Sequence, residues 1–96
     1  FPYTTLFRSF VENKGIGSHL LNYAEIIASD MSKRSIRVIT TNENIKALYF
    51  YQKNKYRITD VNFDAVTEAR KIKPSIPAID KNGIEIRDEI VLRKCL

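Results

Sequence analysis

A pair of glycines, Gly15 and Gly17, stands directly before a long run with helical periodicity and constrains this chain more than any other feature. The apolar residues of the run recur every three or four positions: Ile16, Leu20, Tyr23, Ala24, Ile27 and Met31, and the stripe is widened by Leu21, Ile26 and Ala28. This spacing predicts an amphipathic helix with one apolar stripe, ending near residues 30–33. The segment from Lys14 to Ser18 is therefore expected to open a helix.

Such a helix entry offers a place for phosphate. Glycine has no Cβ to block a close approach and adopts positive φ, and the unpaired N–H groups and dipole of a helix start favour negative charge. We predict that phosphate binds the backbone of Lys14, Gly15, Ile16, Gly17 and Ser18. Taken alone, the two glycines favour a flexible helix entry instead, since a lone G-x-G is a weak signal.

The rest of the chain alternates strands and helices. β-Branched runs, capping residues and alternation predict the following elements. They are a strand from Ser35 to Thr41, a helix from Ile45 to Asn54, a strand from Tyr56 with a bulge near Thr59-Asp60, a helix from Ala65 to Ile72 capped by Asp64, a turn at Asn82-Gly83, and a strand from Ile84 to Leu92. Residues 1–9 have no clear period. The order predicts an α/β fold with a mixed, twisted sheet and flanking helices, and the few strands predict a partial domain.

Composition limits the classes of function. The net charge is +5, but the basic residues are spread along the chain as on an ordinary solvated surface, so nucleic-acid binding is not expected. We expect no signal peptide and no membrane span, because no apolar run approaches the roughly 20 residues that a span needs. The lone cysteine, Cys95, and the lone histidine, His19, support neither a disulfide nor a zinc site. A cytoplasmic, metal-free protein is the expectation.

A second group of residues follows in the helix predicted from Ile45 to Asn54. At about 100° per residue, Asn44, Ala47, Leu48 and Tyr51 lie in one stripe. Asn44 and Tyr51 are then about 10 Å apart along the helix axis, with the small residue Ala47 between them. That gap suits a slim, extended ligand, with an amide at one end and a phenol at the other. The alternatives are a plain N-cap for Asn44 and a core aromatic for Tyr51.

Together the two groups resemble the C-terminal half of the GNAT superfamily of N-acetyltransferases. Those proteins carry a phosphate loop of the form Q/R-x-x-G-x-G/A, a helix, a strand, and then N-x-x-A-x-x-F/L-Y. The matching residues here are Glu12-Asn13-Lys14-Gly15-Ile16-Gly17 and Asn44-x-x-Ala47-x-x-Phe50-Tyr51. The resemblance implies one partial GNAT-like domain over residues 1–96, with a poorly matched segment at 1–9, an acetyl-CoA-binding core at 10–60, and a C-terminal helix and strand at 61–96.

The resemblance also implies acetyl-CoA as the acyl donor, with no metal. The pyrophosphate would lie on the backbone of residues 14–18. Asn44 would hydrogen-bond the pantetheine arm beside Ala47, and Tyr51 would protonate the leaving thiolate. The acceptor would be a primary amine of a small molecule or of a peptide.

Several positions leave alternatives open. Glu12 stands where the family pattern usually has Gln or Arg, and it would repel phosphate unless it points away. Lys55 stands where the pattern usually has glycine, so a positive φ at this position would be costly. Asp88 is a charge on an otherwise apolar strand face, so we expect either a salt bridge, for example to an arginine, or a strand end at the solvent edge. A contact with the acceptor amine is the alternative. A non-catalytic CoA- or nucleotide-binding module and a basic nucleic-acid binder are the rival functions. Pairing of two copies as a homodimer also stays open.

Overall fold

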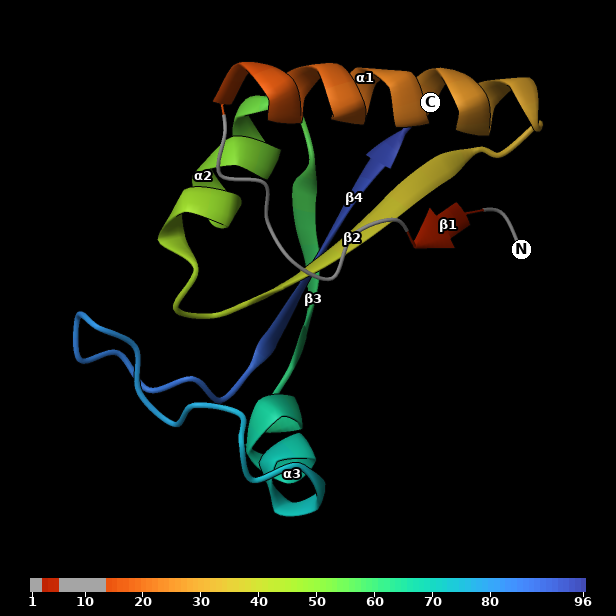
Figure 1. The fold of residues 1–96 in the computed structure, drawn as a ribbon. Helices are drawn as coiled ribbons and strands as arrows, with labels where there is room; N and C mark the ends of the chain where they lie inside the picture. The colour runs from red at the N-terminus through yellow and green to blue at the C-terminus, as the bar shows by residue number, and fades with distance from the viewer. Residues whose placement is uncertain (1–2, 6–13) are drawn as a thin grey trace.

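The computed structural model describes residues 3–5 and 14–96 of the chain. The elements follow in the order β1 (Tyr3–Thr5), α1 (Lys14–Asp30), β2 (Ser35–Thr41), α2 (Ile45–Lys53), β3 (Arg57–Asn62), α3 (Ala65–Ile72) and β4 (Glu89–Cys95). The strands form one sheet in the order β1-β2-β4-β3 (Figure 1). β1 is parallel to β2, and the other two pairs are antiparallel. The predicted mixed α/β fold is confirmed.

Most elements in the middle of the chain are confirmed to within one residue. β2 and α3 have the predicted bounds, α2 ends one residue early, and β3 begins one residue late. The predicted bulge is present as a register shift between Ile58 and Asp60 against β4. These segments are the ones in which a capping residue, a β-branched run or a change of phase is written into the local sequence.

Two elements near the chain termini differ from the prediction. β1 pairs with β2 over three residues, although its sequence has no period that indicates a strand. The strand predicted from Ile84 begins only at Glu89 and continues to Cys95. The residues before it fold back on the preceding loop, where the N–H of Ile86 donates to the carbonyl of Ala78 at 2.9 Å. The alternation of apolar residues that predicts a strand from Ile84 therefore includes residues of this bent segment as well as residues of β4.

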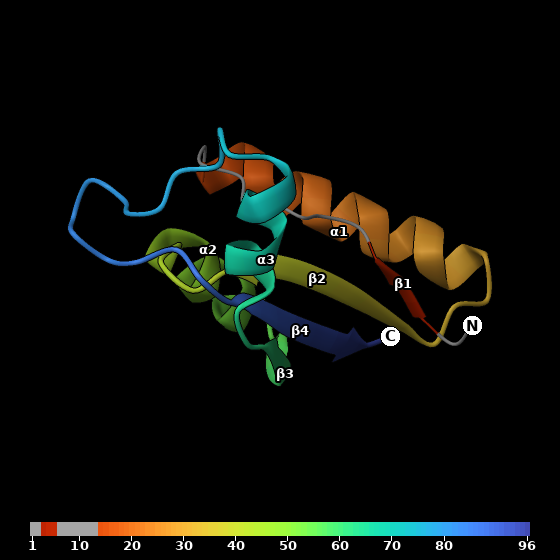
Figure 2. The ribbon, with the colours of Figure 1, turned by 90° about the horizontal axis from the view of Figure 1, so that it is seen from below.

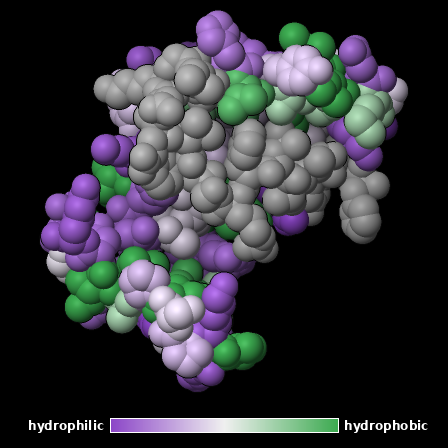
Figure 3. Space-filling view, in the orientation of Figure 1, coloured by the Kyte–Doolittle hydropathy of each residue, from purple (hydrophilic) through white to green (hydrophobic). Residues whose placement is uncertain are grey.

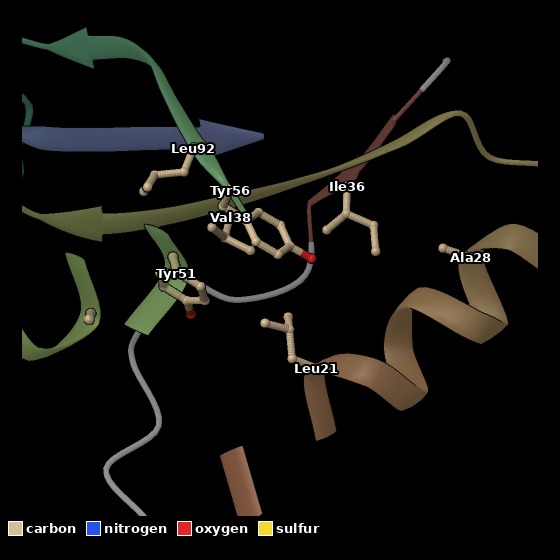
Figure 4. Packing of buried hydrophobic residues seen from close by; sticks show 8 residues of the cluster. Leu21, Ala28, Ile36, Val38, Tyr51, Tyr56 and Leu92 are labelled. Carbon is tan, nitrogen blue, oxygen red and sulfur yellow. The ribbon is translucent and has the colours of Figure 1, made fainter. Parts of the chain in front are cut away.

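The core lies between the sheet and the two helices α1 and α2. Its buried residues come from α1, β2, α2 and β4 and from the residue before β3: Leu21, Ala28, Ile36, Val38, Ala47, Tyr51, Tyr56 and Leu92. Figure 4 shows seven of them, labelled, between α1 and the strands. Polar contacts add to the packing, because Glu25 on α1 accepts a hydrogen bond from the Tyr56 hydroxyl at 2.9 Å and from the Lys94 ammonium at 3.1 Å.

In the described part of α1, the apolar stripe predicted for the first helix packs on the sheet only along its edge. Among the side chains described in α1, those buried are Leu21 and Ala28. The stripe residues Leu20, Tyr23, Ile27 and Met31 are between 40% and 64% exposed, and apolar atoms are visible over α1 at the top of Figure 3. α1 carries apolar residues around much of its circumference, so its period cannot decide which face meets the sheet.

No helix in the described part of the chain is long and apolar enough to cross a bilayer.

α1 and α2 end in the same way. After α2, the N–H of Lys55 donates to the carbonyl of Gln52 at 3.0 Å, and the N–H of Tyr56 donates to that of Tyr51 at 2.9 Å. This is a Schellman motif, in which the residue after the cap adopts positive φ. That residue is Lys55, with φ of 75°, and Ser32 takes the same place after α1 with φ of 62°. The positive φ foreseen at position 55 is thus present without a glycine.

α3 and the loop that leads to β4 form what we call the tail unit, residues 64–88. In both ribbon views the tail unit lies beyond the end of β3 and the start of β4 (Figures 1 and 2). The Arg70 guanidinium holds the loop by donating to the carbonyls of Pro77 and Ile86 at 3.0–3.2 Å. The predicted turn at Asn82-Gly83 is confirmed, and the Asp80 carboxylate accepts backbone N–H groups across it.

Candidate functional site

The glycine segment lies at the N-terminus of a helix, as predicted. α1 begins at Lys14, so the N–H groups that lack a partner within the helix belong to residues 14–17. The first turn contains one lysine and no carboxylate, and in both ribbon views the start of α1 lies beside α2 (Figures 1 and 2). Binding of phosphate by residues 14–18 stays a prediction. The expectation for Glu12 lies outside the described residues.

Asn44 caps α2. Its Oδ1 accepts a hydrogen bond from the N–H of Ala47 at 3.1 Å, the usual geometry of an asparagine N-cap. The plain capping role is therefore confirmed. Because the cap uses Oδ1, the Nδ2 group is the end of this side chain that can donate to a ligand. The contact of Asn44 with a pantetheine arm stays a prediction.

Ala47 and Tyr51 are both fully buried in the core. The Tyr51 ring packs edge-on against Phe50, with centroids 5.4 Å apart, and against Tyr56 at 5.8 Å. The stripe that contains Asn44, Ala47 and Tyr51 thus faces the core rather than open solvent. The core-aromatic role of Tyr51 is confirmed. The ligand-binding role of Ala47 and the catalytic role of Tyr51 stay predictions.

Burial changes the acid strength of the Tyr51 phenol. Removal from water disfavours the charged phenolate and raises the pKa of Tyr51 from 10 to about 12. The pKa of Tyr56 is raised further, by burial and by the hydrogen bond to Glu25. Both phenols therefore keep their protons at neutral pH, and Tyr51 can donate a hydrogen bond to an anion but releases its proton reluctantly.

Asn42, two residues before the cap, is a junction that local sequence patterns do not reveal. Its Nδ2 donates to the carbonyl of Glu85 at 2.8 Å, and its Oδ1 accepts from the N–H groups of Arg87 and Asp88 at 2.9 and 3.0 Å. The partners lie 43 to 46 residues further along the chain. Only the fold brings them together, at the end of the sheet where β2 finishes and β4 begins.

Asp88 has a partner, as expected, but the partner is a backbone group rather than an arginine. Its Oδ1 accepts a hydrogen bond of 2.7 Å from the N–H of Asp64, the residue before α3. The predicted capping role of Asp64 is wrong, because this residue has φ of 61° and makes no side-chain cap, and the bond to Asp88 holds the start of α3 instead. The carboxylate of Asp88 has a structural task at a bend before β4, and the predicted apolar strand face does not extend to it.

Comparison with known proteins agrees with the fold and the order of the motifs. The model of the acetyltransferase (GNAT) family matches residues 6–56, more than half of the chain. Two uncharacterized proteins of Bacillus subtilis (strain 168) are similar: YxbD, 50% identical over 86 residues, and YdhI, 47% identical over 88. The matches cover 90% and 92% of this chain but 54% and 55% of those proteins. The chain therefore spans about half the length of the curated relatives it matches.

Solved structures extend the comparison to three dimensions. An IAA acetyltransferase from Bacillus cereus ATCC 14579 is 33% identical with a TM-score of 0.76, and the match covers 88% of this chain and 53% of that one. A GNAT family acetyltransferase from Elizabethkingia anophelis with acetyl-CoA bound is 32% identical with a TM-score of 0.75, covering 88% and 52%. By its sequence, its strand order and these likenesses, the chain belongs to the GNAT acetyltransferase family.

Proposed function

We propose that this chain forms the acetyl-CoA-binding half of an N-acetyltransferase that transfers an acetyl group to a primary amine of a small molecule or a peptide. The observation that carries the proposal is the combination, in a GNAT fold, of the glycine-containing start of α1 with Asn44 and Tyr51 on the neighbouring α2. A similar structure from Elizabethkingia anophelis has acetyl-CoA bound, which supports the choice of donor.

The donor would be held by backbone and amide groups. The first turn of α1 offers N–H groups and the positive end of a helix dipole to the pyrophosphate, and it carries Lys14 without a nearby carboxylate in that turn. Asn44 would donate from Nδ2 to a carbonyl of the pantetheine arm while its Oδ1 continues to cap α2. These groups bind and orient the thioester.

Tyr51 would act on the leaving sulfur. A new C–N bond forms as the C–S bond breaks, the amine loses one proton, and the sulfur gains one. The pKa of Tyr51 is about 12, above the ordinary thiol value of about 8.5. The phenol would therefore stabilise the departing thiolate mainly by donating a hydrogen bond, and the proton lost by the amine balances the thiol that forms.

The first test is direct binding. Isothermal titration calorimetry at moderate salt should detect acetyl-CoA binding by the protein, and the absence of binding would overturn the proposal. Release of CoA thiol in the presence of a panel of primary amines then reports turnover. Binding without turnover on any amine would favour the rival function, a CoA-binding module without catalysis.

Tyr51→Phe separates catalysis from binding. We expect kcat to fall by about 10²-fold or more, in the usual range for loss of one hydrogen-bond donor to a developing negative charge, while the Kd for acetyl-CoA stays within about threefold. Tyr49→Phe is the matched control, because Tyr49 lies on the same helix but is 65% exposed. Equal turnover in the two variants would show that Tyr51 has only a packing role.

A further inference from the structure

We propose that Asn42 is a positioning residue that couples the tail unit, residues 64–88, to the acetyl-CoA-binding end of α2. The proposal rests on the proposed function, because it assigns Asn42 a part in binding the same donor. Within the described part of the chain, the side-chain hydrogen bonds of Asn42 go to the tail unit. It acts through the loop of residues 41–44, whose last residue is the cap of α2.

The contacts on the tail side use both ends of the carboxamide. One donor and one oxygen of Asn42 serve three backbone groups, the carbonyl of Glu85 and the N–H groups of Arg87 and Asp88. The backbone N–H of Asn42 also donates to the carbonyl of Asp88 at 3.0 Å. These bonds continue the β2–β4 pairing by one step beyond its last register pair, Thr41 with Glu89. The loop and the tail are therefore fastened by four hydrogen bonds from one residue.

The peptide that Asn42 holds is held from the other side by α3. The carbonyl of Arg87 accepts the N–H of Val66 at 2.8 Å, and the Asp88 carboxylate accepts that of Asp64 at 2.7 Å. Arg87 and Asp88 thus lie between the start of α3 and Asn42. A shift of α3 would reach this peptide directly through the backbone bond from Val66 to Arg87, and Asn42 holds the same peptide.

On the other side, Asn42 is two residues from the Asn44 cap. The N–H of Asn44 donates to the carbonyl of Thr41 at 3.1 Å, so the turn that leads from Asn42 into α2 is closed by its own hydrogen bond. Removing the Asn42 carboxamide would leave this end of the turn held by the backbone bond to Asp88 without the three side-chain bonds, and the position of Asn44 would vary more. Since coupling between sites is reciprocal, donor binding at α2 should in turn steady the tail unit.

Hydrogen exchange on the unaltered protein tests the coupling without any substitution. We expect acetyl-CoA to slow amide exchange at α1 and α2 and also at the amides of Asp64, Val66, Arg87 and Asp88. Protection confined to α1 and α2, in a protein that binds acetyl-CoA, would overturn the proposal and leave the proposed function standing. A protein that does not bind acetyl-CoA at all would instead overturn the proposed function.

Variants supply the second test. For Asn42→Ala we expect the Kd and KM for acetyl-CoA to rise about tenfold, within the usual range of coupling between sites, with kcat kept within about threefold. Asn42→Asp keeps the oxygen that accepts from Arg87 and Asp88 but loses the donor to the Glu85 carbonyl, so it should recover the affinity only in part. Asn82→Ala is the matched control, since Asn82 is an exposed asparagine of the tail unit whose backbone N–H makes its bond to Asp80. Unchanged affinity in both Asn42 variants, or an equal loss in the control, would contradict the proposal.

Discussion

α1 and α2 pack on the same face of the sheet but use their sequences differently. α2 has 9 residues, is capped by Asn44, and buries Ala47 and Tyr51 completely. α1 has 17 residues, yet its most regular apolar stripe is largely exposed. The difference shows that the strength of an amphipathic pattern does not measure how much of a helix is buried. What matters is which face the neighbouring elements cover.

The cause lies in how each helix is held. α2 is short and closed at both ends by specific hydrogen bonds, so its rotation about its axis is restricted by its connections to β2 and β3. α1 is longer and is positioned by packing of Leu21 and Ala28 and by the contacts of Glu25 with Tyr56 and Lys94. The spacing of the apolar residues in α1 is compatible with more than one rotation of the helix about its axis, and the tertiary contacts select one of these rotations.

The largest effect is expected where α2 enters the core. Tyr51→Ala should lower the free energy of unfolding by about 3–5 kcal/mol, because it leaves a cavity against Phe50 and Tyr56. Tyr49→Ala, on the exposed side of the same helix, should cost less than about 1 kcal/mol. Urea unfolding with an unchanged m-value measures both. Similar losses in the two variants would mean that α2 is rotated from the orientation described.

The same contrast can be drawn along α1. Leu21→Ala removes a fully buried side chain and should cost about 2–4 kcal/mol. Met31→Ala removes a stripe residue that is 64% exposed and should change stability by about 0.5 kcal/mol or less. Thermal unfolding monitored by circular dichroism compares the pair. A larger loss of stability for Met31→Ala than for Leu21→Ala would indicate that the side of α1 with Met31 packs on the sheet, and it would contradict the orientation described.

Alkaline pH tests the burial of the α2 phenol. Below pH 10 the Tyr51 phenol is neutral in the folded and the unfolded chain, so pH does not act through it. Between pH 10 and about 12 the unfolded chain loses this proton while the folded chain, with pKa about 12, keeps it. The free energy of unfolding should therefore fall as the pH rises, by on the order of 2 kcal/mol from about 1.4 kcal/mol per unit. Tyr51→Phe should show a smaller fall over the same range, and identical slopes would argue against a buried phenol.

The cap of α2 should have a smaller effect. Asn44→Ala removes the hydrogen bond to the Ala47 N–H and should cost about 1 kcal/mol. Asn44→Ser can still accept that bond and should recover most of the loss. Equilibrium unfolding compares the stability of the unaltered protein and the two variants. Equal stability of all three would show that the capping bond does not help to hold α2.

The smallest effect concerns the feature that the two helices share. Lys55→Gly and Ser32→Gly place glycine at the positive φ of each Schellman motif and should each raise the free energy of unfolding by about 0.5–1 kcal/mol. Differential scanning calorimetry resolves such changes in a small protein as shifts of a few degrees. A loss of stability in either variant would indicate that the lysine or serine side chain contributes more than its backbone strain costs.

Much of the fold could be predicted because its causes are local. The β-branched run of β2, the Asn44 cap and the change of phase at Ile58 and Asp60 each depend on residues close in sequence. The resemblance to the GNAT family could likewise be recognised from two short motifs. β1 was not predictable, because three residues without a period form a strand only by pairing with β2.

The candidate site also has some features that the local sequence determines and others that depend on the fold. The sequence places residues 14–18 at a helix start and Asn44, Ala47 and Tyr51 on one stripe, since helix geometry alone relates residues three, four and seven apart. The burial of Tyr51, and with it the raised pKa, depends on Tyr56 and on strands from other parts of the chain. The Asn42 junction joins residues more than 40 positions apart.

By itself, the sequence determined which segments form most of the helices and strands, where α2 begins, and the family to which the chain belongs, because periodicity, capping and short motifs act over a few residues. The tertiary structure decided which face of α1 is buried, where β4 begins, and which partners Asp88 and Asn42 have. Those outcomes depend on surfaces that meet only when distant segments pack together, so they cannot be predicted from a local pattern of residues.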